Sequence, residues 1–285
     1  MEGRLTAIEN PERDIRRIAR LDRETAREIR YHGDVRPETV RLYEENGRLY
    51  GVGYVIKGQG PFYHLAVRVN AHFAAGVRAA EALFQWLTDW FCKADLPEKD
   101  PVLRLWVRDT EDAYRAFAES FGFRERDRML VMQKAAEAGE NPEIAAHVRR
   151  MTLKDPGEAA RYLHAAAEAF DLPPSEAEVR YRLTKGRGRV FGYFEGTDPV
   201  SFVTVFPAGG GVFATENIFT LPAYRRKGYA EALLTEVFAR YREEGAAAFR
   251  LTVYGDDLPA IAFYEKLGYR KAYELSEYGL KQVKT

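Results

Sequence analysis

The sequence of 285 residues has a single cysteine, Cys92, and no apolar run long enough to span a membrane. One cysteine excludes an intramolecular disulfide framework and a multi-cysteine zinc site, and we expect Cys92 to be a packed thiol. The five histidines lack metal-ligand spacing, so no metal is expected. The first residues also lack an apolar signal core. These absences lead us to expect a cytoplasmic protein that does not enter the membrane.

Neither sign of charge is in excess, because 43 lysines and arginines balance 43 aspartates and glutamates. A balanced chain produces no general field that would attract a polyanion. We therefore expect no nucleic-acid partner and no anionic membrane surface, and any recognition of charge must be local.

A segment rich in alanine, glutamate, glycine and proline interrupts the aromatic patterning near the middle of the chain. This change in composition predicts a first domain at 1–135, a linker at 136–147 and a second domain at 148–285. The two domains share an order of strands and helices. Gly76 and Gly228 are expected to begin the long helices of the two copies, and two further glycines, Gly122 and Gly268, to end the short ones. The spacing indicates an internal duplication.

The hydrophobic pattern of each half alternates between strands and helices. In the second half it predicts a helix over 155–170 with Asp155 as N-cap, a second helix after a Pro-Pro-Ser entry, and an antiparallel meander over 188–221. Two separate strands are expected at the end, over 269–276 and 277–283. In the first half one continuous helix is expected over 11–29. The order predicts an α/β fold with a mixed sheet flanked by helices.

Three cations, Arg225, Arg226 and Lys227, precede Gly228 where the long helix of the second half begins. Positive charge is unfavourable at this end of the helix dipole, so these side chains either are solvated or face an anion. The first copy has Phe73, Ala74 and Ala75 in their place. Only the second copy therefore carries the cationic turn.

Two motifs of the second half resemble the signature of the GNAT superfamily of N-acetyltransferases. The turn Arg225-x-x-Gly228-x-Ala230 matches R/Q-x-x-G-x-G/A, between a strand and a helix. A downstream helix matches N-x-x-A-x-x-[FL]-Y-x-x-x-G-[FY] through Asp257, Ala260, Phe263, Tyr264, Gly268 and Tyr269, with Asp257 in place of the usual asparagine.

The resemblance covers the chain from about Arg149 onward well and the first half in outline. It implies two tandem GNAT-like domains, in an arrangement similar to mycothiol synthase, each with a mixed, mostly antiparallel central sheet flanked by helices. The first domain is then degenerate, and the second holds the only cofactor site.

The resemblance also implies acetyl-CoA as co-substrate, with its pyrophosphate on the glycine-opened helix start. Such a start is a ready anion site, and a glycine lets the backbone approach the phosphates. The family binds the cofactor with the turn and with the strand before it, which correspond to Phe219, Thr220, Leu221, Arg225, Arg226, Lys227, Gly228, Tyr229, Ala230 and Glu231. Asp257 is expected either to orient the pantetheine arm or to cap the helix that follows it.

Two residues are expected to handle protons. Tyr264 stands where many family members place the phenol that protonates the departing thiolate, while the first copy has Ala118 there. The alternative is that Tyr264 is only a packed aromatic. Glu216, on the strand before the turn, is the expected base, directly or through water, and the alternative is a solvent-facing strand glutamate.

We therefore expect an N-acetyltransferase that moves acetyl from acetyl-CoA to a primary amine of a small molecule or peptide. The amine is expected to attack directly in a ternary complex, without a metal. The alternative is a non-catalytic acyl-CoA-binding sensor or scaffold. The first copy is expected either to shape the acceptor cleft or to hold a homodimer, and the identity of the acceptor has no template in the sequence.

Overall fold

The computed structural model describes residues 3–70, 72–136, 146–184 and 188–282, so most of the predicted linker, 137–145, lies outside the described residues. The chain forms two compact units: unit 1 comprises 1–127 and 276–285, and unit 2 comprises 128–275. This division differs from the sequence-based domains 1–135 and 148–285. The reason is that two long strands, β6 (Arg124–Ala135) and β12 (Arg270–Lys281), each contribute residues to both units.

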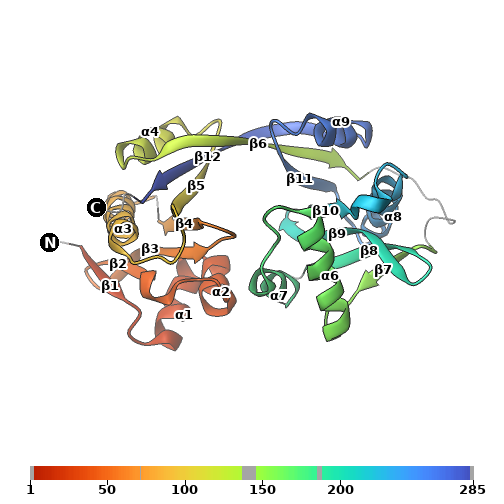
Figure 1. Cartoon of the computed structure of the whole chain (residues 1–285). Coiled ribbons are helices and arrows are strands. Elements are labelled where there is room, and N and C mark those ends of the chain that lie inside the picture. Colours follow the sequence, from red (N-terminus) through yellow and green to blue (C-terminus); the bar gives the residue numbers. More distant parts are fainter. Residues whose placement is uncertain (1–2, 71, 137–145, 185–187, 283–285) are drawn as a thin grey trace. The chain divides into compact units, whose positions relative to one another are not determined.

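Unit 1 is a sheet in the order β1-β2-β3-β4-β5-β12, and Figure 1 shows the blue strand β12 beside β5. The pairs β1–β2, β2–β3 and β3–β4 are antiparallel, and β4 pairs with β5 in parallel. Its other strands are β1 (Arg4–Ala7), β2 (Arg41–Glu45), β3 (Arg48–Lys57), β4 (Phe62–Val69) and β5 (Val102–Arg108). Its helices are α1 (Pro11–Leu21), α2 (Arg23–Tyr31), η1 (Pro37–Thr39), α3 (Ala74–Lys93) and α4 (Asp112–Ser120).

Two helices, α1 and α2, replace the single helix expected over 11–29, so that prediction was wrong. The break is at Asp22, whose backbone is extended (φ −154°, ψ 118°). The Asp22 carboxylate accepts a hydrogen bond from the Thr25 amide at 2.6 Å and so caps α2. An aspartate favours this capping role over a helix interior, which explains the break.

Unit 2 has the strand order β6-β11-β10-β9-β8-β7. Strands β8, β9 and β10 form the predicted antiparallel meander, and β10 pairs with β11 in parallel. Its strands besides β6 are β7 (Val148–Met151), β8 (Arg189–Glu195), β9 (Asp198–Gly209), β10 (Val212–Thr220) and β11 (Ala248–Tyr254). Its helices are α6 (Pro156–Ala169), α7 (Glu176–Thr184), η2 (Pro222–Tyr224), α8 (Tyr229–Glu243) and α9 (Leu258–Lys266).

The sheet of unit 2 carries a different hydrophobic cluster on each face. Val203 and Val205 of β9 pack in the cluster that contains α8 residues such as Val237. Phe202, the residue before Val203 in the strand, packs with Tyr162 of α6, with ring centroids 5.8 Å apart. Since side chains alternate between the faces of a strand, α8 covers one face and α6 the other.

The predicted helix starts of unit 2 are confirmed by their caps. The Asp155 carboxylate accepts from the Gly157 amide at 3.2 Å, and Pro156 opens α6. The Ser175 hydroxyl oxygen accepts from the Glu178 amide at 3.0 Å at the start of α7. Both caps use short polar side chains that satisfy amides without a partner inside the helix.

Two expectations on the rest of the chain were wrong. One continuous strand, β12, replaces the two final strands. Gly279 lies within this strand and does not make a turn. A Cβ on Gly279 would lie 2.1 Å from Cδ of Arg126. The glycine instead lets the Arg126 side chain cross the strand.

Cys92 is exposed on α3 and is not a packed thiol. Among the described residues, no helix is long and apolar enough to cross a membrane.

The duplication is visible where the short helices end. Gly122 and Gly268 both adopt the left-handed conformation, with φ of +86° and +88°. The Phe123 amide donates to the carbonyl of Ala118 at 3.3 Å, and the Tyr269 amide to the carbonyl of Tyr264 at 3.0 Å. Helix α4 of the first copy and helix α9 of the second thus end in the same Schellman motif, with a glycine in the left-handed position.

The last residues of the chain stabilise unit 1. Tyr278 is 2% exposed and packs in the cluster that contains Leu87 and Phe123. The Gln282 side-chain amide donates to the carbonyl oxygens of Phe91 and Ala94 at 2.6 and 2.7 Å. The core of unit 1 therefore depends on residues that follow unit 2 in the sequence.

We predict that Tyr278→Ala lowers the free energy of unfolding of unit 1 by about 3–5 kcal/mol, because it removes a buried aromatic ring and leaves a cavity. Denaturant unfolding followed by circular dichroism measures this. The control Lys281→Ala, an exposed position on the same strand, should change the value by less than about 0.5 kcal/mol. Equal effects of the two variants would contradict the packing role.

Candidate cofactor and catalytic site

The parallel strands of unit 2 separate after three residue pairs. Val212, Phe213 and Ala214 of β10 pair with residues 248–250 of β11. At the next position the Thr215 hydroxyl donates to the Arg250 carbonyl at 3.3 Å. Beyond it β10 continues to Thr220 with pairing only to β9 among the described residues. The second edge of β10 is therefore left for another extended group to pair with.

A β-bulge in β10 follows the point of separation. The register with β9 shifts between Glu216 and Phe219, and Asn217 has φ +47°. Asparagine tolerates this left-handed conformation better than most residues. The bulge was not predicted, and its one signal in the sequence is Asn217 within an otherwise apolar run. One extra residue lets Glu216 and Phe219 lie on the same face of the sheet.

Glu216 lies on the face that α6 covers. It pairs directly with Thr204 of β9, and opposite residues of an antiparallel pair share a face. The Thr204 hydroxyl lies 3.3 Å from the Tyr162 hydroxyl of α6. Glu216 is partly buried, so its environment differs from that of a freely solvated strand glutamate.

Three residues at the end of β10 are expected to pair with pantetheine, and Thr220 is the one whose backbone amide points toward the open edge of the strand. The Leu221 amide donates to the Val200 carbonyl at 3.0 Å, so it points toward β9. The Phe219 carbonyl accepts from the Ser201 hydroxyl at 3.2 Å on the same side. Because successive peptide groups alternate, the Thr220 amide points away from β9.

The helix start at Gly228 offers unsatisfied amides. Gly228 is the N-cap of α8 with φ +83°, and no side chain caps the helix. Arg226, two residues before it, is also left-handed, with φ +62°. The first amides of a helix lack partners inside it, and here they meet the positive end of the dipole. A Cβ on Gly228 would meet no atom within 4 Å, so the space over the turn is open to a ligand.

The corresponding helix start in unit 1 is built differently. Helix α3 begins at Ala74 with Phe73 as N-cap, so Gly76 is its third residue and does not begin the helix as expected. The Gly76 amide donates to the Phe73 carbonyl at 2.8 Å, and Gly76 is buried. The Arg78 guanidinium forms two hydrogen bonds with Glu45, at 2.9 and 2.8 Å. Neither the amide nor the cation is open to an anion here.

The cations of the turn have different surroundings. Arg225 donates through Nε to the Thr220 carbonyl at 3.0 Å and so braces the loop between β10 and α8. The Lys227 ammonium lies 5.1 Å from the centroid of the Tyr224 ring. Within the described part of the chain, the Arg226 guanidinium has no hydrogen-bond or ion-pair partner. Arg226 is thus the cation of the turn that is most available to a ligand.

A cavity of about 360 Å³ lies over the turn, lined by Thr220, Tyr224, Arg225, Arg226, Gly228, Tyr229, Ala230, Glu231 and Phe263. Seven of these were expected as cofactor residues. Tyr224 and Phe263 were not, although both flank predicted site residues. The cavity leaves out the expected Phe219, Leu221, Lys227 and Asp257.

Asp257 takes the capping role, one of its two expected roles. Its Oδ1 accepts from the Ala260 amide at 3.1 Å at the start of α9. At the other end of α9, the Lys266 ammonium forms an ion pair with Glu231 at 2.7 Å. This pair offsets the negative charge of a glutamate that lines the cavity. Among the described residues, no group of three His, Cys, Asp or Glu side chains could hold a metal ion.

Tyr264 is held among aromatic rings, one residue after Phe263, which lines the cavity. Its ring lies 5.3 Å from that of Phe263 and 5.9 Å from that of Tyr269, between centroids. The Tyr269 hydroxyl in turn lies 3.4 Å from the Thr215 hydroxyl, where β10 and β11 separate. Burial, with a smaller contribution from the charge of Asp257, raises the pKa of Tyr264 to about 12. The phenol therefore keeps its proton at neutral pH, as a proton donor must.

We predict that the phenolate absorbance of the wild type and of Tyr264→Phe coincides up to about pH 11, because Tyr264 ionises with a pKa of about 12. An ordinary tyrosine ionises near pH 10. In denaturant, where every phenol is solvated, the wild type should show one extra tyrosine at about pH 10. An extra wild-type titration near pH 10 in the folded protein would contradict the assigned environment.

Known acetyltransferases are similar to this chain in sequence. The sequence profile described as "Acetyltransferase (GNAT) family" matches residues 158–269, within unit 2. Mycothiol acetyltransferase of Saccharomonospora viridis is 24% identical in an alignment of 193 positions, which covers 59% of this chain and 61% of that protein. The match thus spans about three fifths of this relative.

Several solved structures match the chain over nearly its whole length. A tandem GNAT protein from the clavulanic acid biosynthesis pathway has a TM-score of 0.67 at 13% identity and covers 100% of both chains. A GCN5-related N-acetyltransferase from Sphaerobacter thermophilus has a TM-score of 0.65 at 18% identity, with 99% of this chain and 98% of that chain covered. These likenesses confirm the predicted fold of two GNAT-like units. Residues 158–269 thus form a domain that matches the GNAT acetyltransferase family, and the chain has the tandem GNAT fold over its whole length.

Proposed function

We propose that the chain transfers an acetyl group from acetyl-CoA to a primary amine of a small molecule or peptide, by direct attack of the amine. The observation that carries the proposal is the uncapped start of α8 at Gly228, next to the edge of β10 that separation from β11 leaves without a partner strand. One feature suits a pyrophosphate and the other suits an extended amide-containing arm.

In this proposal the cofactor lies along β10 and over the turn. Acetyl-CoA supplies the thioester whose acyl carbon the amine attacks. The amides from Arg226 to Glu231 and the Arg226 guanidinium bind the pyrophosphate, while the Thr220 amide binds the pantetheine arm. An amide of the bulged segment donates to the thioester oxygen, which stabilises the charge that develops there. Arg225 contributes by holding the loop through its bond to the Thr220 carbonyl.

Tyr264 acts as the general acid. The new C–N bond forms as the C–S bond breaks, and the departing sulfur needs a proton. The phenol carries one at neutral pH, as a tyrosine with an ordinary pKa near 10 does and as one with its pKa raised to about 12 also does. The hydrogen-bonded end of α9 and the two neighbouring rings fix its position. A positioned donor of this kind contributes about 10²-fold or more to the rate.

Glu216 acts as the general base. An alkyl amine has a pKa near 10 and is largely protonated at neutral pH, so a proton must leave before attack. Glu216 receives that proton directly or through water. Its place on the α6 face, at the bulge of β10, separates it from α8, which covers the opposite face. The acceptor thus approaches from the α6 side of the sheet and the pyrophosphate is held at α8.

The names of the relatives support acetyl transfer at the level of the reaction. Because these relatives are only 24% identical over part of their length, their acceptor substrate cannot be assigned to this chain. The test is release of free CoA thiol when the purified chain is mixed with acetyl-CoA and a panel of small amines and amino-terminal peptides. Release with at least one amine supports the proposal. Tight CoA binding with no release across the panel would favour a non-catalytic acyl-CoA sensor.

We predict that Tyr264→Phe lowers kcat about 10²-fold and leaves the affinity for CoA nearly unchanged, because it removes one proton and no packing. Tyr241→Phe is the matched control, since burial raises the pKa of the Tyr241 phenol of unit 2 to about 12 as well. It should keep wild-type kcat. Steady-state kinetics and calorimetric titration with CoA measure the two quantities. Equal kcat values for the two variants would remove Tyr264 from the mechanism.

We predict that Glu216→Gln also lowers kcat about 10²-fold, because an amide cannot accept the proton of the amine. Raising the pH should restore part of the rate, since more of the free amine is then neutral. Glu195→Gln, at an exposed position of the same sheet, is the control and should behave as wild type. If Glu216→Gln retains wild-type kcat at neutral pH, the base is another group.

A further inference from the structure

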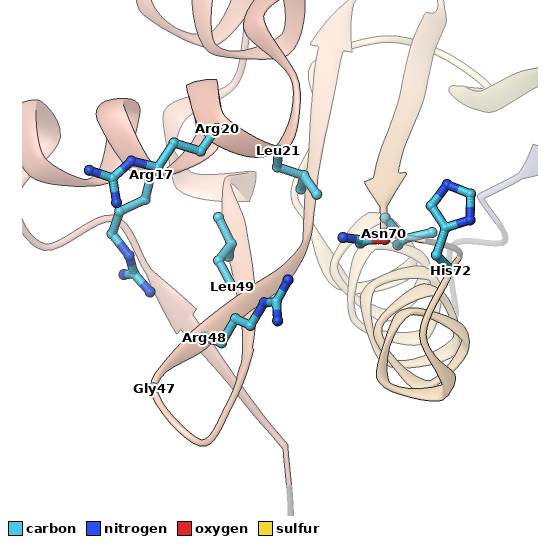
Figure 2. A pocket seen from close by; sticks show the side chains of 9 residues that line it. Arg17, Arg20, Leu21, Gly47, Arg48, Leu49, Asn70 and His72 are labelled. Carbon is cyan, nitrogen blue, oxygen red and sulfur yellow. The ribbon is translucent and has the colours of Figure 1, made fainter.

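Unit 1 contains a cavity of about 690 Å³ that the proposed function does not use (Figure 2). Three elements form it: the C-terminal end of α1, the turn between β2 and β3, and the segment after β4. The lining residues are Arg17, Arg20, Leu21, Gly47, Arg48, Leu49, Val69, Asn70 and His72. Its volume is typical of sites for small organic ligands.

The wall of the cavity is cationic. Three of its nine residues are arginines and none is acidic, although the chain as a whole has equal numbers of both charges. The Arg17 guanidinium is paired with Glu44 at 2.8 Å and Asp14 at 3.5 Å, so its charge is largely offset. Arg20 and Arg48 are exposed and, within the described residues, have no carboxylate partner. These two provide the net positive charge of the wall.

Arg48 is held in place without using its hydrogen-bond donors. Its guanidinium carbon lies 4.8 Å from the centroid of the Phe73 ring and 5.4 Å from that of Tyr50. The two rings themselves meet edge to face at 5.9 Å. Stacking of this kind orients a guanidinium and leaves its N–H groups free for an oxyanion. Arg48 is therefore preorganised for binding.

Asn70 adds a neutral donor on the opposite side of the cavity. Its backbone is fixed, because its amide donates to the Tyr50 carbonyl at 2.9 Å and its carbonyl accepts from the Phe73 amide at 3.3 Å. The side-chain oxygen is buried without a donor in the described part of the chain. Figure 2 shows the side-chain nitrogen on the side that faces the arginines. This oxygen is an acceptor, so it does not bind the anionic group itself, and an N–H or O–H group of a ligand would satisfy it.

Apolar side chains lie between these polar groups. Leu21, Leu49 and Val69 line the same cavity, so a simple inorganic ion would leave much of it unfilled. A ligand with an anionic group and an apolar body matches both parts of the wall. Arg48 and Asn70 would bind the anionic group, and the leucines and valine would contact the body.

We propose that this cavity of unit 1 is a binding site for a small organic oxyanion, with a phosphate or carboxylate group held by Arg20, Arg48 and Asn70. Both groups present the planar or tetrahedral oxygens that arginine recognises. The site is independent of the acetyl-CoA site proposed for unit 2, since every residue that lines it belongs to unit 1.

The test follows the ring-proton resonances of His72 in the full chain while phenyl phosphate or benzoate is added. His72 lines the cavity and is one of only five histidines, so His72→Gln assigns its signal. We expect a saturable shift with at least one probe. The better probe identifies the group, phosphate or carboxylate. Arg48→Ala and Arg20→Ala should each weaken binding at least about tenfold, as expected for loss of a charge-assisted contact.

Arg16→Ala is the matched control. Arg16 is on α1, like Arg20, but does not line the cavity, so the variant removes the same charge and should keep the wild-type affinity. Gly228→Ala should keep it as well, which separates this site from the one in unit 2. No saturable shift with either probe would overturn the proposal. An equal loss of affinity in Arg16→Ala and Arg48→Ala would also overturn it, since it would reduce the effect to general charge screening.

Discussion

The separation of β10 from β11 is the constraint on which the site of unit 2 depends. Parallel strands normally satisfy each other's backbone groups along their length, and here the pairing stops after Ala214. The residues that follow keep one edge open, and the bulge at Asn217 turns Glu216 and Phe219 to one face. Helix α8 begins near the end of the same strand, at an uncapped glycine. The open edge follows from one strand leaving its neighbour, and the oriented carboxylate and the free amides lie along that edge.

Unit 1 shows which of these features come with the fold and which are specific to unit 2. Its strands β4 and β5 also pair in parallel over three residue pairs, so the separation is common to both copies. Its β4 pairs with β3 without a bulge, from Gly51 with Val69 to Lys57 with Tyr63. Its long helix starts without a left-handed glycine, and Ala118 stands at the position of Tyr264. The bulge, the glycine turn and the phenol thus occur together in one copy and are absent together from the other.

The sequence predicted the fold of each unit well, because periodicity, caps and glycine stops act locally. Asp155 and Gly268 are examples whose roles depend only on nearby backbone. It could not predict that β12 runs on as one strand into unit 1, since the packing of Tyr278 involves residues more than a hundred positions away. The bulge at Asn217 was missed for a similar reason, because a register shift depends on the partner strand. The anionic-ligand cavity of unit 1 was missed because its arginines come from separate elements that only the fold brings together.

The central claim is that the turn at Gly228 binds the cofactor and the start of α3 does not. The most direct measurement is a crystal structure of the chain with CoA bound. We expect pyrophosphate density against the amides from Arg226 to Glu231, with the pantetheine arm along the open edge of β10. Pyrophosphate density at Ala74 to Gly76 of α3, with none at Gly228, would contradict it.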